Sequence, residues 1–459
     1  MSKIEVDAID KQSGSTLTLG GSGTAVTLAC GATQTGFGRT GTVDWQTSIK
    51  TAASFTAVNG EGYFVDTSSN AVTANLPAGS AGAIVSFKDY AQNFDTNALT
   101  IAANGSEKIE GLTTDLILST EGIAVTLVYG DATKGWQAVN SNEIVNSVKF
   151  IAATGGTVTT VCTNFKVHTF TGPGTFCVSC GGNAAGSNTV DYLVVAGGGA
   201  GATIASNNTG KGGGGGAGGY RESSGAASGC YTVSPLGSGV SALPVSATAF
   251  PITVGAGGAI APTSSQTEGN SGVNSTFSTI TSAGGGGGGA SNPGSAGVAG
   301  GSGGGGAYCS SVAGGAGNTP PTSPAQGTSG GNGRPCVPYS AGGGGGATVA
   351  GTDATDPASG PGGAGATSSI NGTPTARAGG GGGSGKSFAP TPSTTGTGGT
   401  GGGGAGGTRT GPTASTAGTA GTANTGGGGG GGNPGSGNPA GSVAGAGGSG
   451  IVIIRYKFQ

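Results

Sequence analysis

The sequence predicts an all-β protein that also contains a bundle of packed polyglycine II helices. Glycine supplies 109 of the 459 residues, against a usual share of about 7%. Outside the glycine tracts, short apolar runs alternate with polar residues as β-strands do. Charged residues make up only 8%, which argues against a disordered tail, because net charge keeps such tails solvated. We expect a short β-repeat stalk at residues 1–40, an antiparallel β-domain at 41–142, and a glycine-rich slab closed by β-strands at 143–459.

The charge balance and the apolar runs exclude two classes of partner. The 17 basic residues do not outnumber the 19 acidic ones, so there is no basic excess to displace counterions from nucleic acid. The longest apolar runs, 193–196 and 451–454, are far shorter than the roughly 20 residues of a membrane span. No apolar segment of a secretory signal follows Met1. We expect a chain made in a cytoplasm, with neither nucleic-acid binding nor membrane insertion.

Residues 1–40 contain a short repeat. The segment 16–20 (TLTLG) is echoed nine residues later by 25–28 (AVTL), and each unit reads as a short alternating strand beside a glycine turn. Such units bury too little apolar surface to be stable alone. We therefore expect an attachment segment or an intertwined stalk.

Residues 41–142 have the pattern of an antiparallel all-β domain. Alternating apolar runs recur at short spacing, and turn residues such as those of 77–79 (PAG) separate them. The acidic residues are scattered along these runs, which is typical of a solvated surface rather than of a carboxylate pair for acid–base chemistry. The expected strands are 72–76, 84–87, 99–101, 116–118, 125–129 and 136–139.

Residues 143–459 combine a frame of strands, at 150–196 and 450–457, with polyglycine tracts at 197–448. The expected frame strands are 157–161, 165–170, 175–179, 192–195 and 451–456. We expect the last two to pair with one another, because they are the only strong β formers available to close the domain.

The glycine tracts are open to three interpretations. A collagen helix is excluded, because glycine does not recur at every third position. A flexible linker is compatible with the Gly and Ser content, although a linker needs neither repeated tracts of similar length nor a strand at each end. The third interpretation is a bundle of polyglycine II helices. The structural tracts begin at Gly212, Gly284, Gly303, Gly342, Gly379, Gly401 and Gly426.

A polyglycine II bundle is favoured on physical grounds. A helix of this type makes no internal hydrogen bonds, so its amides and carbonyls are satisfied only by neighbouring helices. Close approach requires that no Cβ stand between the helix axes, which selects glycine and tolerates alanine at the rim. Six residues at about 3.1 Å each make a slab about 20 Å thick. The segments rich in Ser, Thr, Asn and Pro would then form turns on its two faces.

Several segments resemble the glycine-rich domain of bacteriophage tail-fibre and adhesin proteins, over about residues 150–459. They are 190–199 (VDYLVVAGGG), 251–258 (PITVGAGG), 275–277 (STF) and 450–456 (GIVIIRY). In related fibre-tip adhesins, packed polyglycine helices present variable loops that bind the host surface. Upstream, the segments 87–90, 99–106, 125–129 and 135–136 resemble a β-domain that is frequent in the fibre proteins of marine phages.

The resemblance implies a virion tail fibre or fibre-tip adhesin, often a homotrimer. The implied partners are a host cell-surface glycan or outer-membrane protein and, through the N-terminus, other virion tail proteins. The main alternative is a structural surface fibre, either a head fibre or an extracellular filament subunit, in which the slab is a spacer or an assembly surface. The position of the loops separates the two: they are free at a distal tip in an adhesin and buried between subunits in a filament.

Three motifs contain residue types found in catalytic or metal sites, and each is better explained by a structural role. A zinc site needs about four ligands, and four residues that could supply them are Cys162, His168, Cys177 and Cys180. Buried thiols on strands are the simpler interpretation. Asp353 and Asp356 have the residue types of a glycosidase pair or a cation site, yet a solvated turn is the favoured interpretation. We expect no enzyme activity, no metal and no cofactor.

The third motif is the stretch from Gly380 to Ser387, which formally matches the phosphate-binding pattern GxxxxGKS. That pattern needs a strand before it and a helix after it. Here a glycine tract precedes it and Pro390 follows closely, which prevents a helix of useful length. We interpret the match as a chance result in a low-complexity tract.

The remaining candidates for function are aromatic and cationic residues in the turns. Rigid aromatic faces give contact area at low entropic cost and suit recognition of sugars and polar surfaces. Tyr308 and Tyr339 could equally pack over the edge of the slab, beside Cys309 and Cys336. The expected receptor-binding residues are Tyr308, Arg334, Tyr339, Arg377, Lys386, Phe388 and Arg409.

Overall fold

The computed structural model describes residues 43–139 and 149–459, except 184–185, 205–209, 230, 263–266, 292–294, 309–312, 336–338, 387–392, 412–413 and 434–442. The chain divides into two compact units, residues 1–147 and 148–459. The repeat predicted at 1–40 and the boundary predicted at 142 lie outside the described residues. The described part is all-β apart from one short 3-10 helix, Pro235–Gly237. Among the residues described, no helix is long and apolar enough to cross a membrane.

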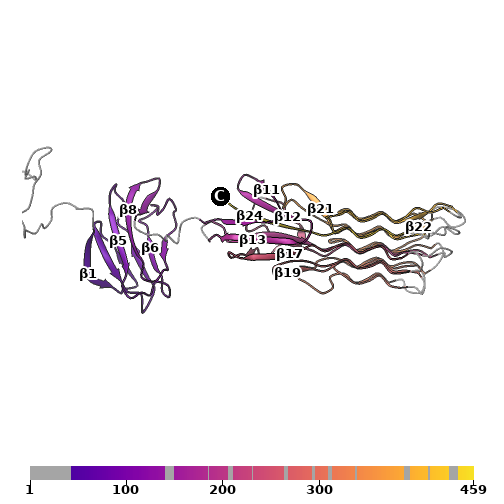
Figure 1. The fold of residues 1–459 in the computed structure, drawn as a ribbon, viewed down its shortest axis with the longest axis horizontal. Helices are drawn as coiled ribbons and strands as arrows, with labels where there is room; N and C mark the ends of the chain where they lie inside the picture. The colour runs from indigo at the N-terminus through magenta and orange to yellow at the C-terminus, as the bar shows by residue number, and fades with distance from the viewer. Residues whose placement is uncertain are drawn as a thin grey trace, which may run out of the picture. The chain divides into compact units, whose positions relative to one another are not determined.

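The first unit is built from nine strands in two sheets (Figure 1). The first sheet has the order β1-β3-β5-β8-β9 and the second the order β2-β4-β6-β7. The strands are β1 (Asp44–Lys50), β2 (Ser54–Thr56), β3 (Glu61–Val65), β4 (Val72–Asn75), β5 (Ile84–Asp89), β6 (Leu99–Ala102), β7 (Leu116–Leu118), β8 (Ala124–Asp131) and β9 (Gly135–Ala138).

The stacking in this unit resembles that of a β-solenoid. From β1 to β6 the chain alternates between the two sheets, so each coil adds one strand to each sheet in the same direction. The pairs β1–β3, β3–β5, β2–β4 and β4–β6 are accordingly parallel, whereas β7, β8 and β9 pair antiparallel. The prediction of an antiparallel domain is therefore wrong for the pairs among the first six strands, because a coil that returns to the same sheet brings the chain back in its original direction.

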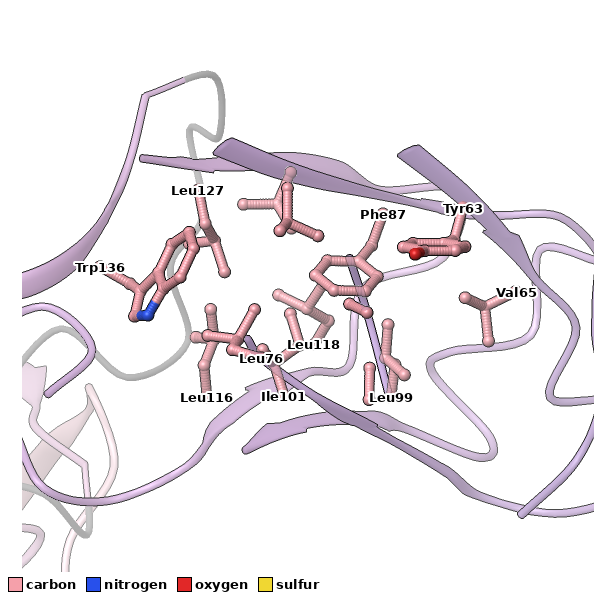
Figure 2. Packing of buried hydrophobic residues seen from close by; sticks show 14 of the residues in the cluster. Tyr63, Val65, Leu76, Phe87, Leu99, Ile101, Leu116, Leu118, Leu127 and Trp136 are labelled. Carbon is pink, nitrogen blue, oxygen red and sulfur yellow. The ribbon is translucent and has the colours of Figure 1, made fainter. Parts of the chain in front are cut away.

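The core of the first unit lies between its two sheets (Figure 2). Tyr63 and Phe87 extend from the first sheet toward Leu99 and Ile101 of the second. Trp136 of β9 packs at one end of the same core. All five side chains are at most 2% exposed. Burial of such side chains contributes about 1.5–3 kcal/mol each, so this unit has a conventional apolar core.

The second unit has a strand frame and a large glycine-rich part (Figure 1). Its strands are β10 (Ile151–Thr154), β11 (Thr157–Val161), β12 (Phe165–Phe170), β13 (Gly174–Gly181), β14 (Thr189–Val195), β15 (Tyr220–Glu222), β16 (Leu243–Pro244), β17 (Ala249–Thr253), β18 (Ser275–Phe277), β19 (Ile280–Ser282), β20 (Ala366–Ser368), β21 (Thr375–Arg377), β22 (Gly385–Lys386), β23 (Thr408–Arg409) and β24 (Ile451–Lys457).

Two sheets form the strand frame. One has the order β11-β12-β24-β14-β15, with β16 also paired to β14, and the other has the order β10-β13-β17-β18-β19. Phe176, Phe277 and Tyr456 belong to the apolar cluster of this frame. The predicted pairing of the strand near Tyr192 with the terminal strand is confirmed: β14 and β24 are antiparallel, with Val195 opposite Ile451.

The segments between β14 and β24 that carry the glycine tracts form extended, wavy threads running away from the strand frame (Figure 1). We keep the name glycine slab for them. Along 212–219, the backbone amides donate in rotation to three other threads: 426–432, 283–289 and 342–345. Gly215 donates to Gly429 at 2.8 Å, and the residues three positions away on either side donate to the same thread. This thread thus has a three-residue hydrogen-bond period rather than one ladder partner.

The carbonyls of the same thread accept hydrogen bonds from three further threads. Amides of 196–202, 302–305 and 381–384 donate to them at 2.8–3.1 Å. The thread 212–219 therefore has six hydrogen-bonded neighbours. A Cβ built on Gly215 would lie 2.1 Å from the carbonyl oxygen of Gly199, so glycine is required for the close approach of these backbones.

Alanine occurs inside the slab as well as at the rim, where it was predicted. Ala200, Ala217 and Ala341 are fully buried. Ala217 packs in an apolar cluster with Leu193 and Ile453 of the strand frame. A methyl group is therefore accommodated where it meets the side chains of the frame as well as at the rim.

Candidate functional site

The candidate site lies at the distal end of the glycine slab, which we define as the end that holds β22, away from β12, β13 and β24 (Figure 1). The direction of each thread follows from its hydrogen bonds. The thread that leaves β14 at Val195 runs toward the distal end, and 211–219 returns from there to β15. The thread 381–384 is antiparallel to 212–215, so Lys211 and Lys386 lie at the same end.

Two predicted tyrosines meet at the distal end. Tyr308 follows one thread and Tyr339 precedes another, and their ring centroids are 4.3 Å apart at an interplanar angle of 61°. Both side chains are half-buried. The contact joins two segments that are separated by some thirty residues of sequence. The neighbouring Cys309 and Cys336 lie outside the described residues.

Arg334 and Asp356 form an ion pair at this end. The Nη1 atom of Arg334 lies 3.1 Å from Oδ2 of Asp356, and the two side chains are 27% and 57% exposed. Asp353 instead accepts a hydrogen bond of 2.7 Å from the backbone amide of Asn332. The two carboxylates thus face different partners, in agreement with the interpretation of this segment as a turn.

A cluster of three cationic side chains occupies another part of the distal end. Lys386 of β22 and Arg409 of β23 are partners in a parallel strand pair. Arg409 is only 8% exposed, and its Nε donates to the carbonyl of Gly411 at 3.2 Å. Burial, followed by the charge of Arg409, lowers the pKa of Lys386.

The third member of this cluster, Lys211, was missed by sequence reasoning. It is 1% exposed, and its Nζ donates to Oδ1 of Asn433 at 2.8 Å and to the carbonyl of Gly210 at 3.4 Å. The amide of Asn433 donates in turn to the carbonyl of Gly385, next to Lys386. Burial is the main cause that lowers the pKa of Lys211 to about 7, with the charges of Arg409 and Lys386 adding to it. The sequence feature that could have indicated it is a single lysine between glycines, at 210–212.

Arg377 does not belong with the other predicted receptor-binding residues. It lies in β21, at the strand end of the slab (Figure 1), and is 4% exposed. Burial lowers its pKa, against the opposing effect of the nearby Tyr220 and Glu222. We therefore remove Arg377 from the set, because a side chain buried at the opposite end is not available to a receptor. Phe388 lies outside the described residues.

The zinc ligand set considered from the sequence is not assembled. His168 is buried, with Nδ1 2.7 Å from the carbonyl oxygen of Gly155 and Nε2 3.1 Å from the hydroxyl of Tyr456. Burial lowers its pKa. Among the described residues, no three potential ligand side chains are grouped to hold a metal. The expectation of buried thiols is nevertheless wrong for Cys162 and Cys177, which are exposed.

The phosphate-binding pattern that ends at Ser387 also lacks its function in this fold. In a phosphate loop the backbone amides must be free to cradle the ligand. Here the amides of Gly381, Gly382 and Gly383 donate at 2.8–3.0 Å to carbonyls of other threads. The glycines of this stretch are therefore structural.

Comparison with known sequences agrees with this architecture. The signature of one protein family, described as a glycine-rich domain, matches residues 171–457. The match covers β24, nearly all of the glycine slab and most of the strand frame. No curated protein matches the chain closely enough to count as a relative. Since the matched region is more than half of the chain, the protein belongs to the glycine-rich domain family.

Proposed function

We propose that the protein is a fibre adhesin of a virion, and that its glycine slab is a bundle of polyglycine II helices carrying receptor-binding turns at the distal end. The observation that carries the proposal is the gathering of five expected receptor-binding residues at one end of the slab. They come from separate segments of the chain: Tyr308, Arg334, Tyr339, Lys386 and Arg409.

The three-residue hydrogen-bond period supports the polyglycine II assignment. A polyglycine II helix has three residues per turn and no internal hydrogen bonds. Each successive amide therefore points to a different neighbour and every third amide to the same one, as along 212–219. A bundle of this kind is stiff without an apolar core, because each backbone group in its interior is bonded to another thread. Stiffness suits a support that presents turns at a distance from the strand frame.

The chemistry of the distal end suits a polar surface. Half-buried tyrosine rings offer flat contact area at low entropic cost, and cations beside them offer charged hydrogen bonds. The proposed partner is a host cell-surface glycan or outer-membrane protein. Attachment to other virion tail proteins through the N-terminus and assembly as a homotrimer complete the proposal, since three copies would give avidity to weak contacts.

Adsorption of the full chain to bacterial cells tests the function. Purified, fluorescently labelled protein is added to a panel of candidate host strains, and bound protein is counted by flow cytometry. We expect adsorption to at least one strain, and its loss in a variant with Tyr308→Ser and Tyr339→Ser. The matched control is Val158→Ser, because Val158 is 46% exposed on β11 at the strand end.

The outcomes separate the adhesin from a structural fibre. Equal adsorption of the tyrosine variant and the control would show that the distal turns are not the binding surface. A protein that adsorbs to no strain but polymerises, as seen by light scattering, would favour the structural fibre and overturn the proposal.

A further inference from the structure

A lysine and an asparagine meet inside the distal end of the glycine slab. Lys211 immediately precedes the thread 212–219, and Asn433 immediately follows the thread 426–432. These threads are antiparallel neighbours, because every third amide of the first donates to a carbonyl of the second, in reverse order along the chain. The backbone hydrogen bonds of the slab therefore place the two side chains next to one another.

The two side chains are in contact and shielded from water. Lys211 is 1% exposed and Asn433 is 0% exposed. The Nζ atom of Lys211 lies 2.8 Å from Oδ1 of Asn433. Since a C=O bond is about 1.2 Å long, the amide carbon Cγ of Asn433 lies within about 4 Å of Nζ. The nitrogen of an amine is thus held beside the carbon of an amide, in a place that is closed to solvent.

The amine of Lys211 can act as a nucleophile at neutral pH. Burial is the main cause that lowers its pKa to about 7, and the charges of Arg409 and Lys386 act in the same direction. A lysine with the ordinary pKa of 10.5 is almost fully protonated at pH 7 and has no lone pair to share. A large share of Lys211 is instead neutral at pH 7, and a neutral amine attacks carbonyl carbons.

We propose that Lys211 and Asn433 react with one another to form an isopeptide bond, which cross-links two threads of the slab. The Nζ atom attacks Cγ of Asn433, one proton moves from Nζ to Nδ2, and the bond between Cγ and Nδ2 breaks. A new amide between Nζ and Cγ is formed, and one molecule of ammonia leaves. Because one amide replaces another, the reaction needs no oxidant, reductant or added group. The cross-link is a property of the slab itself and goes beyond the receptor binding proposed for its distal end.

Neighbouring groups favour the reaction at two atoms. Negative charge builds on Oδ1 as the amine adds to the carbonyl, and the positive charges of Arg409 and Lys386, which act on this place, stabilise it. The Nδ2 atom donates a hydrogen bond to the carbonyl of Gly385. The same carbonyl stabilises the positive charge that Nδ2 gains when it takes the proton.

The residue after Asn433 removes the common route by which an asparagine loses ammonia. In that route the side chain closes a ring with the backbone amide nitrogen of the next residue. Position 434 is proline, which has no backbone N–H to enter such a ring. Loss of ammonia from Asn433 without uptake of water therefore indicates attack by another nitrogen, and Nζ of Lys211 is in contact with it.

Mass spectrometry of the purified full chain tests the bond. After the protein has been held at neutral pH until its mass is constant, the intact mass should be lower than that of the sequence by one molecule of ammonia. Trypsin should not cleave after Lys211, because an acylated lysine is not its substrate. The digest should contain one branched peptide that joins the segments around Lys211 and Asn433.

Two other results of the same digest would overturn the proposal. One is a pair of separate peptides with Lys211 and Asn433 unmodified. The other is an ammonia deficit carried by an unbranched peptide, as ring closure at Asn332 before Gly333 would give. Both measurements use the unsubstituted protein, so they decide the question even if a variant fails to fold.

Three variants assign the bond to this pair. Lys211→Arg keeps a cation, but a guanidinium stays protonated and is no nucleophile. Asn433→Ala has no side-chain amide. Both should keep the full mass of their sequence. The matched control is Lys88→Arg, because Lys88 is half-buried and donates to the backbone carbonyl of Gly122. It should lose ammonia as the unsubstituted chain does, whereas an ammonia deficit that persists in Lys211→Arg would refute the assignment.

Discussion

Replacement of Gly215 by alanine should destabilise the second unit strongly, although it adds only one methyl group. The new Cβ would lie 2.1 Å from the carbonyl oxygen of Gly199 and 2.8 Å from the carbonyl carbon of Ala200. An ordinary contact of this kind is at least 3.4 Å, so the threads must separate by about an ångström. Neither neighbour is a flexible side chain that can rotate away.

The expected magnitude follows from the bonds that this separation weakens. The amide of Gly215 donates to Gly429 and its carbonyl accepts from Gly381, both at 2.8 Å. Each intramolecular hydrogen bond contributes about 1 kcal/mol net, and overpacking a dense interior costs about 1–3 kcal/mol. We expect a loss of about 3–5 kcal/mol, which for a domain of 150–250 residues is roughly 6–20 °C in Tm, with this larger unit toward the lower end.

The assay is differential scanning calorimetry of the full chain, with Gly172→Ala as the matched control. Gly172 has no atom within 4 Å of a built Cβ and no positive φ. Its replacement should change stability by less than about 1 kcal/mol, in the stabilising direction, because alanine restricts the unfolded chain. If Gly215→Ala proved as harmless as Gly172→Ala, backbone contact between threads would not be what holds the slab together.

Three further predictions concern other parts of the chain. Between pH 7 and 10 the second unit, in protein whose Lys211 amine is unreacted, should become more stable as pH rises, because the folded form releases the Lys211 proton near pH 7 and the unfolded form only near 10.5. Unfolding temperatures of Lys211→Met should rise less over this range, with a remainder from Lys386, whose pKa is also lowered. A rise equal to that of the unsubstituted protein would contradict the burial argument. Phe87→Ala should lower the free energy of unfolding of the first unit by about 3–5 kcal/mol, because it leaves a cavity in the core. In calorimetry, the unfolding temperature of the first unit should fall while that of the second unit stays unchanged. Cys162 and Cys177 should react with iodoacetamide in the native protein, as peptide mass spectrometry can measure, and protection of both would show that they are covered.

Five of the eleven frame strands were predicted from local alternation of apolar residues, whereas β10 and β15 to β19 were missed. The strands expected at 157–161 and 165–170 are β11 and β12 with the same bounds. The strands β1 and β2 were missed, because their sequences, DWQTSIK and SFT, lack regular apolar alternation and are ordered by pairing with β3 and β4. Parallel pairing there was also not foreseen, since partner choice depends on the path of the coil rather than on the strand itself.

The candidate site could be predicted only in part, for a related reason. Aromatic and cationic residues are rare in the glycine-rich part of the chain, so each one is a candidate for binding. Tyr308, Tyr339 and Lys386 were selected as candidates for this reason. Arg377 and Arg409 look alike in sequence, each next to a glycine tract. Arg377 precedes its tract, whereas Arg409 follows its own. The threads 379–385 and 401–407 run parallel, because every third amide of the first donates to every third carbonyl of the second. The two arginines therefore lie at opposite ends of the slab.

The sequence by itself determined that this protein is made of strands and glycine threads, because only glycine allows backbones to approach so closely and only the apolar runs can form strands. Tertiary structure alone decided which threads are neighbours and which side chains share an end. A polyglycine thread carries no side chains that distinguish one neighbour from another, so the partners are chosen by turn geometry and by the strands that anchor the slab. The meeting of Lys211, Lys386 and Arg409 is a consequence of that choice.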